Sequence, residues 1–447
     1  MKQHQANQYT DRIKDPLDTL REPFKRFLQI ESSGGIILII ATLSALIIAN
    51  SAWGDEYESL WKTYFTIGAD FIQLSKPIIL WINDGLMAIF FFMVGLEIKR
   101  EMLAGELSSP KQAAFPIAAA IGGMLLPALL FIILNKGEVG SEGWGIPMAT
   151  DIAFSLGILS LLGKRVPLAL KVFLVAFAIV DDIGAVLVIA IFYSAEIYWN
   201  MLLVAGGLFL ILVLFNYYNV RYIPLYMIVG WIIWYLFLIS GIHPTIAGVL
   251  IAFTIPASPK IRLRDFTSRL KKDLDGFCDE PCEDTITLNN RQLAAIDNME
   301  THIHKVQSPL QSLEHTLHGF VTYFVMPLFA FANAGVVISG ASLETFQGLT
   351  LNISTALIFG KITGIFLFAY LAVKLRLADL PTDIKWKHIF GVGMLGGIGF
   401  TMSLFISNLA YANVILLNQA KLGILLGSFV AAVGGFIFLK FTLNNKQ

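Results

Sequence analysis

The 447 residues are 56% hydrophobic and only 14% charged, whereas a soluble domain carries about 25% charged residues. Apolar stretches of about 20 residues, the length that crosses a bilayer, recur along the chain and exclude an ordinary soluble protein. The 32 basic and 32 acidic residues balance, so the charge does not suggest nucleic acid as a partner.

The chain is predicted to be an all-α polytopic membrane protein with about 12 transmembrane helices. The first residues are polar without a short apolar core, so no signal peptide is expected. Pro116 and Pro127 in the third span favour a position buried among other helices. The spans are expected near 34–50, 78–96, 113–134, 146–162, 171–193, 201–216, 224–240, 242–256, 320–338, 353–373, 388–410 and 420–440.

Lys and Arg residues sort between alternate connecting segments. The intervening outer loops hold few of them: Lys62, Lys76, Lys136 and Lys421. The positive-inside rule therefore places the richer segments, and both chain termini, in the cytoplasm. Those richer segments contain Arg21, Lys25 and Arg26; Lys99 and Arg100; Lys164, Arg165 and Lys171; and Lys374, Arg376, Lys385 and Lys387.

A long polar segment interrupts the series of spans. Its first part, SPKIRLRDFTSRLKKDLDGFCDE, is charged and expected to be mobile, while its later part has helical character. Cys278 and Cys282 lie here without further ligands at suitable spacing, so we interpret them as bystanders and not as a zinc site. The expected organisation is a cytoplasmic N-terminal segment (1–33), eight transmembrane helices (34–256), a cytoplasmic connector (257–319), four transmembrane helices (320–441) and a cytoplasmic tail (442–447).

Few charges remain at membrane depth. A carboxylate at the bilayer centre costs roughly 2.5 to 3.5 kcal/mol on insertion scales, so such residues usually line ion or proton pathways. The alternative, a salt bridge that only packs helices together, stays open, above all for the residue nearest the outer face, Asp84. The full set is Asp84, Asp151, Asp181, Asp182 and Lys361.

Asp181 and Asp182 are adjacent in the fifth span. Neighbouring helix positions differ by about 100°, so one carboxylate can face a cavity while the other meets a partner on another helix. Lys361 is the only basic residue deep in a span, and an unpaired ammonium there would be costly. It is therefore the natural partner.

The fourth and eleventh spans are rich in glycine and proline, which predicts interrupted helices. GWGIPMATDIAF places Gly-Ile-Pro before Thr150 and Asp151, and IFGVGMLGGIGFT has five glycines before Thr401. Broken helices carry partial charges at their new ends, which Asp151 and Lys361 would offset. Paired interruptions indicate inverted-topology repeats, spans three to five and ten to twelve, with two broken helices crossing at the midplane.

With ATDIAF, VDDIGA, GLEIKRE, SGIHPTIAGV, PLFAFANAG and GKITGI, the chain resembles the NhaA-type sodium/proton antiporter family from about residue 20 to 440. That family is itself a known example of inverted repeats and broken helices, so this point of agreement is not independent support. The chain departs from the family in two places. Ile362 follows the lysine where members often have proline, and the connector is long.

The resemblance implies a secondary active transporter, not an enzyme, that exchanges internal Na⁺ for external protons by alternating access. It makes Asp182 the main Na⁺ ligand, with Asp181 and Thr150 beside it. It pairs Asp181 with Lys361, and places Asp151 and Lys361 at the crossing as charge-compensating groups. It also implies the bacterial inner membrane and no cofactor, with Li⁺ as a further candidate substrate and residues 57–75 as a candidate homodimer contact.

The family also has a charged cytoplasmic cluster that is linked to pH sensitivity. Histidine titrates in the physiological range, and a neighbouring carboxylate shifts that titration. An ordinary solvated helix end explains the histidines equally simply when the residues are read without the resemblance. The cluster maps to Glu97, Lys99, Arg100 and Glu101 after the second span and to Glu314, His315 and His318 before the ninth.

Carboxylates supply the oxygen ligands that hard cations prefer, and burial favours their protonated form. Protons and Na⁺ are therefore expected to compete for a coupled pair of acids, with two protons per Na⁺ as the electrogenic hypothesis. The strongest rival is a sodium-coupled symporter, which needs a cavity for an organic solute. An intramembrane aspartyl protease would take its carboxylates from two facing helices, and a channel would not need broken helices that cross.

Overall fold

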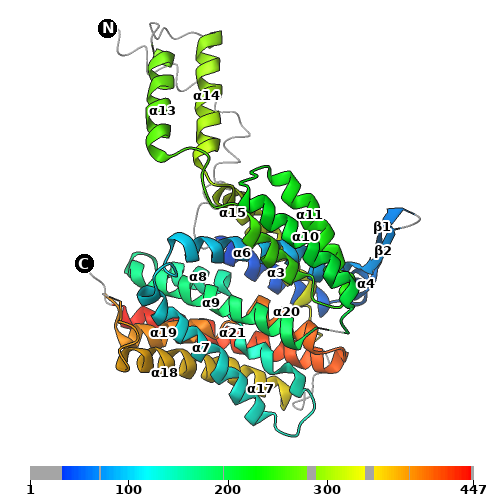
Figure 1. Cartoon of the computed structure of the whole chain (residues 1–447). Coiled ribbons are helices and arrows are strands. Elements are labelled where there is room, and N and C mark those ends of the chain that lie inside the picture. Colours follow the sequence, from blue (N-terminus) through cyan, green and yellow to red (C-terminus); the bar gives the residue numbers. More distant parts are fainter. Residues whose placement is uncertain are drawn as a thin grey trace, which may run out of the picture. The chain divides into compact units, whose positions relative to one another are not determined.

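The computed structural model describes residues 33–69, 72–194, 196–278, 288–337, 347–381 and 383–443. Most of these residues are helical, and the strands among them form one antiparallel hairpin of β1 (Tyr64–Ala69) and β2 (Ile72–Pro77) (Figure 1). Among the described residues, nine helices are long and apolar enough to cross a membrane, and up to eleven if each of two bent pairs is one span. The chain is therefore a polytopic membrane protein, as predicted.

Every expected span coincides with a helix or with consecutive helices, including one that is too short to be counted above, α12 (Thr245–Thr254). The others are α3 (Ser33–Ala49); α5 (Ile78–Leu80), η1 (Trp81–Leu86) and α6 (Met87–Ala104); α7 (Pro110–Leu134); η2 (Ser141–Met148) and α8 (Ile152–Leu161); α9 (Leu168–Phe192); α10 (Trp199–Tyr217); α11 (Ile223–Ser240); α15 (Pro309–Phe320), η4 (Val321–Val325) and α16 (Met326–Asn333); α17 (Leu349–Thr355), η6 (Ala356–Gly360) and α18 (Lys361–Lys374); α19 (Trp386–Gly396) and α20 (Phe400–Ala410); and α21 (Val414–Thr442). The short elements α4 (Gly54–Lys62) and η3 (Gly163–Arg165) lie between spans.

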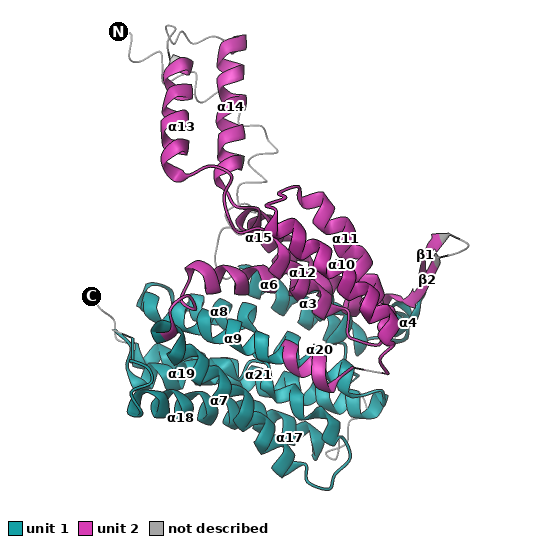
Figure 2. Ribbon diagram, in the orientation of Figure 1, with its two compact units in different colours: residues 1–63, 111–185, 326–447 teal, residues 64–110, 186–325 magenta. Residues whose placement is uncertain are grey.

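The helices form two compact units, each assembled from separate parts of the chain (Figure 2). Unit 1 comprises residues 1–63, 111–185 and 326–447, and unit 2 comprises residues 64–110 and 186–325. Both predicted repeats, spans three to five and ten to twelve, contribute to unit 1. The division into cytoplasmic and membrane segments stays a prediction.

In unit 1, helices α7 and α18 cross at a pair of glycines. A Cβ atom added to Gly122 or to Gly364 would overlap the carbonyl oxygen of the other glycine. Small residues are what let membrane helices approach this closely. Pro116 and Pro127 both lie within α7 and are buried, as expected for a helix surrounded by others.

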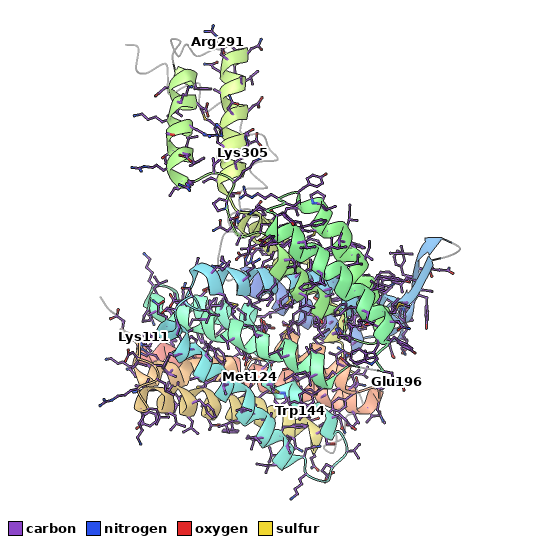
Figure 3. All side chains as sticks on the ribbon, viewed as in Figure 1. Lys111, Met124, Trp144, Glu196, Arg291 and Lys305 are labelled. Carbon is purple, nitrogen blue, oxygen red and sulfur yellow. The ribbon has the colours of Figure 1, made fainter. Side chains whose placement is uncertain are left out.

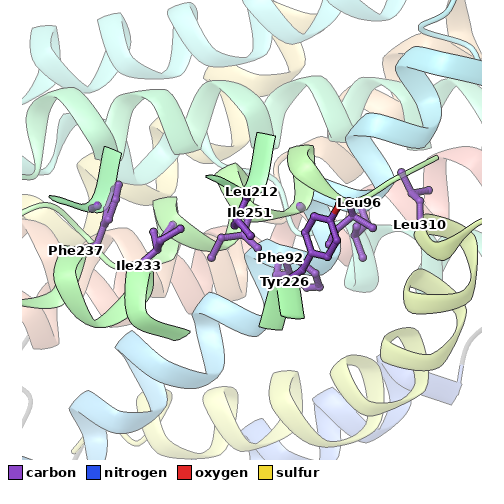
Figure 4. Packing of buried hydrophobic residues seen from close by; sticks show 12 residues of the cluster. Phe92, Leu96, Leu212, Tyr226, Ile233, Phe237, Ile251 and Leu310 are labelled. Atoms are coloured by element: carbon purple, nitrogen blue, oxygen red, sulfur yellow. The ribbon is translucent and has the colours of Figure 1, made fainter. Parts of the chain in front are cut away.

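In unit 2, an apolar cluster joins helices α6, α10, α11, α12 and α15 (Figure 4). Gly95 on α6 and Gly248 on α12 permit close contact, because a Cβ at either would press on the facing helix. The phenol of Tyr226 lies in the cluster and donates a 2.9 Å hydrogen bond to the Val220 carbonyl. The labelled members are Phe92, Leu96, Leu212, Tyr226, Ile233, Phe237, Ile251 and Leu310.

The connector contains a pair of helices, α13 (Leu263–Cys278) and α14 (Asn290–Val306), that lie side by side in Figure 1. The first part was expected to be mobile, but residues 263–278 are helical. The physical reason is the spacing of Phe266, Leu270 and Phe277, which gives α13 one apolar side. Cys282 lies outside the described residues.

Candidate functional site

Two helices of unit 1 are broken where the glycine and proline content predicted it. Between η2 and α8 the chain runs extended at residues 149–151. Between α19 and α20 it is interrupted at residues 397–399, and the two halves are bent by 44°. Each break leaves helix-end N–H and C=O groups that need partners away from water.

The two breaks contact each other and satisfy many of these groups mutually. Side-chain hydroxyls of both broken helices, together with the backbone N–H of Asp151, bond to backbone carbonyls of the other broken helix. The contacts, donor first, are Asp151 N–H to Ile398 O at 2.6 Å, Thr150 Oγ1 to Gly396 O at 2.9 Å, Ser155 Oγ to Leu395 O at 2.9 Å, and Ser403 Oγ to Ile146 O at 2.7 Å.

Asp151 caps two half-helices at once. Its Oδ1 accepts from the Phe154 N–H at 3.0 Å, at the start of α8. Its Oδ2 accepts from the N–H and the hydroxyl of Thr401 at 3.0 and 2.5 Å, at the start of α20. A negative charge is favourable at a helix N-terminus, and here one carboxylate meets two such ends. The predicted compensating position of Asp151 is therefore present in the geometry.

Replacing Asp151 with Ala should destabilise the protein by roughly 2 to 4 kcal/mol, because two caps of about 1 kcal/mol are lost and buried N–H groups lose their acceptor. The measurement is the thermal unfolding midpoint in detergent. Asp151→Asn is the matched control, because one amide oxygen still accepts from Phe154, and it should lie between wild type and Ala. A midpoint for Ala equal to that of wild type would contradict the double-cap interpretation.

Asp181 and Lys361 form the predicted ion pair. The Lys361 Nζ lies 3.0 and 2.9 Å from the two Asp181 carboxylate oxygens, and both side chains are 0% exposed. The ammonium also lies 5.8 Å from the centroid of the Phe177 ring, within reach of a cation–π attraction. A pair this deep contributes little net stability, but the loss of either partner strands a buried charge.

Asp182 is equally buried, at 1% exposure, and sits one residue further along α9. Its position is turned about 100° from that of Asp181, and its charge still acts on Lys361. Thr150 lies near the Asp181 carboxylate, and its hydroxyl donates to the Gly396 carbonyl. Asp181, Asp182, Lys361 and Thr150 thus belong to one buried polar cluster beside the two breaks.

The candidates for pH sensing separate into two groups, both in unit 2. The Nε atom of Arg100 donates to both oxygens of Glu314 at 2.9 and 3.0 Å, and the guanidinium also contacts Glu101 at 2.7 Å. Glu97 lies close enough to share this charge network. His315 and His318, in contrast, have exposed side chains.

Lys99 does not belong to that network. Its Nζ donates to the carbonyl oxygens of Phe253 and Ile255, at 2.7 and 2.5 Å, where α12 ends. Those carbonyls carry the negative end of the helix dipole, so the ammonium stabilises the end of α12. The structure thus gives Lys99 a packing contact.

Asp84 forms a salt bridge with a neighbouring residue, and such a salt bridge was the alternative left open for it. Its carboxylate pairs with Lys76 at 2.9 Å, and the His243 Nε2 lies 3.6 Å away. Sequence reasoning did not single out His243, although it lies at the start of the eighth expected span and within SGIHPTIAGV.

Chemically, the cluster of unit 1 offers carboxylate and hydroxyl oxygens with one compensating ammonium. Such oxygens suit protons and hard cations. Among the described residues there is no group of three or more His, Cys, Asp and Glu side chains that could together hold a metal ion. Sequence reasoning had not assigned Thr401, Ser155 or Ser403 to the site, although each lies within five residues of a break.

A model of the family described as Na⁺/H⁺ antiporter 1 matches residues 25–439. The chain is 48% identical to the Na⁺/H⁺ antiporter NhaA of Oleidesulfovibrio alaskensis, over 97% of this chain and 96% of that protein. It is 49% identical to the NhaA of Sulfurimonas denitrificans over 96% and 98% of the two chains. For the NhaA of Bacteroides fragilis the identity is 47%, over 96% and 100%.

Proposed function

The chain belongs to the Na⁺/H⁺ antiporter 1 family, and from this membership we propose that it exchanges Na⁺ for protons across a membrane. In this proposal the chain is a transporter and not an enzyme, and Na⁺ and protons are its substrates. The single observation that carries the proposal is the similarity along nearly the whole chain. The buried acidic cluster beside two broken helices supports it.

In this proposal Asp182 is the main Na⁺ ligand, with Asp181 and the Thr150 hydroxyl as further oxygen ligands. Burial penalises a charged carboxylate, so an acid in this cluster holds either a proton or a cation. Na⁺ and protons therefore compete for the same oxygens. If the site changes sides only when one of them is bound, competition alone produces exchange.

The Asp181–Lys361 pair supports an exchange of two protons for each Na⁺. When Na⁺ binds Asp181, the Lys361 ammonium loses its partner. Burial then favours release of a proton from Lys361. Asp182 and Lys361 would then each give up one proton per cycle, and transport would be electrogenic. Fluxes measured at several voltages test this ratio, because one-for-one exchange moves no net charge and its driving force does not depend on the membrane voltage.

The sidedness is also part of the proposal. The distribution of Lys and Arg favours cytoplasmic termini in a bacterial inner membrane, with internal Na⁺ leaving in exchange for external protons. Li⁺ is proposed as an alternative substrate, because it is also a hard monovalent cation. A homodimer is proposed through the β1–β2 hairpin.

We propose Arg100 as the centre of the pH-sensing network, because it contacts Glu314 and Glu101 together. Arg100→Gln should move the activity curve to higher pH by roughly one unit, since removing the guanidinium favours the protonated carboxylates. The measurement is antiport rate against pH in proteoliposomes. His318→Gln is the matched control on α15, exposed and expected to leave the curve nearly unchanged. A larger shift for His318→Gln than for Arg100→Gln would reverse the assignment.

The proposal is tested with liposomes that contain the protein and a pH-sensitive dye. Na⁺ added outside should make the lumen more alkaline whichever way the protein is inserted, because protons leave as Na⁺ enters. No proton movement at any pH, from folded protein, would instead favour a sodium-coupled symporter and a search for an organic solute.

A further inference from the structure

His388 is a buried titratable side chain of unit 1 to which the proposed function gives no role. It lies in the first turn of α19, and its side chain is only 7% exposed. Gly391, about one turn further along the same side of α19, packs against Leu439 of α21. The ring of His388 therefore faces the end of α21, where the backbone of Thr442 lies near it.

The His388 ring caps the N-terminus of α19. Lys385 precedes the helix with an extended backbone, and its N–H donates a 3.2 Å hydrogen bond to the Nδ1 atom of His388. In a capping box the third residue of a helix accepts from this same N–H, usually through a Glu or Gln side chain. Here the imidazole is the acceptor, so Nδ1 carries no proton. The capping bond therefore exists only while the ring is neutral.

The surroundings of the ring oppose a positive charge on it. Lys387 and Lys385 are the charged groups that act on the ring, and both are cations. The start of a helix also carries partial positive charge. The exposed Lys111, at the start of α7, lies at the same end of unit 1 (Figure 3). The other described charged groups at this end of the packed helices α18 and α21, and in the loop between α18 and α19, are exposed: Lys374, Arg376, Asp379, Asp383 and Lys440.

The other end of α19 belongs to the buried cluster. The carbonyls of Leu395 and Gly396 accept the hydrogen bonds of Ser155 and Thr150. Only about three helical turns separate these carbonyls from His388. A change in how firmly the first turn is held therefore reaches the half-helix that supports the proposed ion site.

We propose that His388 is a regulatory proton site, separate from the acids that exchange Na⁺ and protons. Histidine changes its charge between about pH 5 and 8. When the ring takes up a proton at Nδ1, the Lys385 N–H loses its acceptor and the first turn of α19 opens. Protonation thus opposes the folded turn, so the turn is most stable at alkaline pH and loses stability as the pH falls. Acid then loosens α19 and lowers transport.

The test is backbone hydrogen–deuterium exchange of residues 385–390, measured by mass spectrometry on the full-length protein in lipid nanodiscs at pH 8 and at pH 5. His388→Gln is the matched variant, because glutamine at this position offers an acceptor that does not titrate. His388→Ala removes the acceptor at both pH values. Comparing the three proteins with one another at each pH cancels the chemical rate of deuterium exchange, which itself depends on pH.

At pH 8 we expect the wild-type protein and His388→Gln to take up deuterium alike, and His388→Ala to do so roughly fivefold faster, the effect of losing one cap. At pH 5 the wild-type protein should take up deuterium roughly fivefold faster than His388→Gln. Equal uptake by these two proteins at pH 5 overturns the proton site. Equal uptake by wild type and His388→Ala at pH 8 overturns the cap. If His388→Ala does not fold, the comparison of wild type with His388→Gln still decides.

A second readout rests on the proposed function and is kept apart from the first. In dye-loaded proteoliposomes, His388→Gln should continue to exchange Na⁺ for protons at a lower pH than the wild-type protein does. An unchanged activity curve, with the difference in deuterium uptake present, overturns the link between α19 and transport. No proton movement by either protein counts against the proposed function alone, because the deuterium uptake does not depend on transport.

Discussion

Replacing Asp182 with Asn is expected to abolish Na⁺-dependent proton movement. The amide keeps the shape of the side chain but removes the charge, and it has no proton to exchange for a cation. Both halves of the proposed cycle therefore fail at the same residue. The measurement is the pH change in dye-loaded proteoliposomes after Na⁺ addition, and we expect a signal indistinguishable from that of protein-free liposomes.

Two variants make this result specific. Asp182→Glu keeps a carboxylate and should retain part of the activity. Thr150→Ala removes one neutral ligand of about 1 kcal/mol, so the apparent Na⁺ affinity should fall only by roughly fivefold. Equal and mild losses for Asp182→Asn and Thr150→Ala would show that Asp182 is not the main ligand.

The sequence predicted the centre of the candidate site because membrane burial makes charge conspicuous. Asp181, Asp182 and Lys361 stand out in otherwise apolar spans, since a charge there is costly. The glycines before Thr401 predicted a broken helix for a similar reason, because few other residues permit one. Partner choice followed by elimination, since only one basic residue lay deep in a span. The ion pair between Asp181 and Lys361 confirms that choice.

Other features depended on contacts that a single sequence does not encode locally. The hydroxyls of Ser155 and Ser403 bond to carbonyls that lie 240 and 257 residues away along the chain. Serine in an apolar helix is too common to mark such a contact.

 The charge at Asp84 was visible, but its partner His243 lies on a different segment and was not singled out. Helix α13 was missed because its many charges hid the spacing of Phe266, Leu270 and Phe277.

The pH-sensing candidates show the same limit. Sequence spacing groups His315 and His318 with Glu314 on one helix face. The structure joins Glu314 to Arg100 on α6 and leaves both histidine side chains exposed. Whether a residue on an amphipathic helix faces a partner depends on how that helix packs, and the α6–α15 contact is not encoded in either helix alone.

The buried ion pair should behave as a unit, and a double-mutant cycle is expected to show it. Lys361→Met alone leaves the Asp181 carboxylate without a partner, and Asp181→Asn alone leaves the Lys361 ammonium without a partner. Each should destabilise the protein by roughly 3 to 5 kcal/mol, whereas the double variant should approach wild-type stability because no charge remains unpaired. The unfolding midpoint of the four proteins in detergent measures the coupling. Additive losses in the double variant would contradict a paired role.

The same double variant also separates stability from proton coupling. With Asp182 retained, it should still bind Na⁺, but it lacks the proposed source of the second proton. We therefore expect its exchange to become one-for-one, so that the membrane voltage no longer drives transport. Asp182→Asn is the matched control, since it removes the ligand but keeps the ion pair, and it should give no exchange at all. A double variant that still transports with the wild-type voltage dependence would show that the second proton is not carried by Lys361.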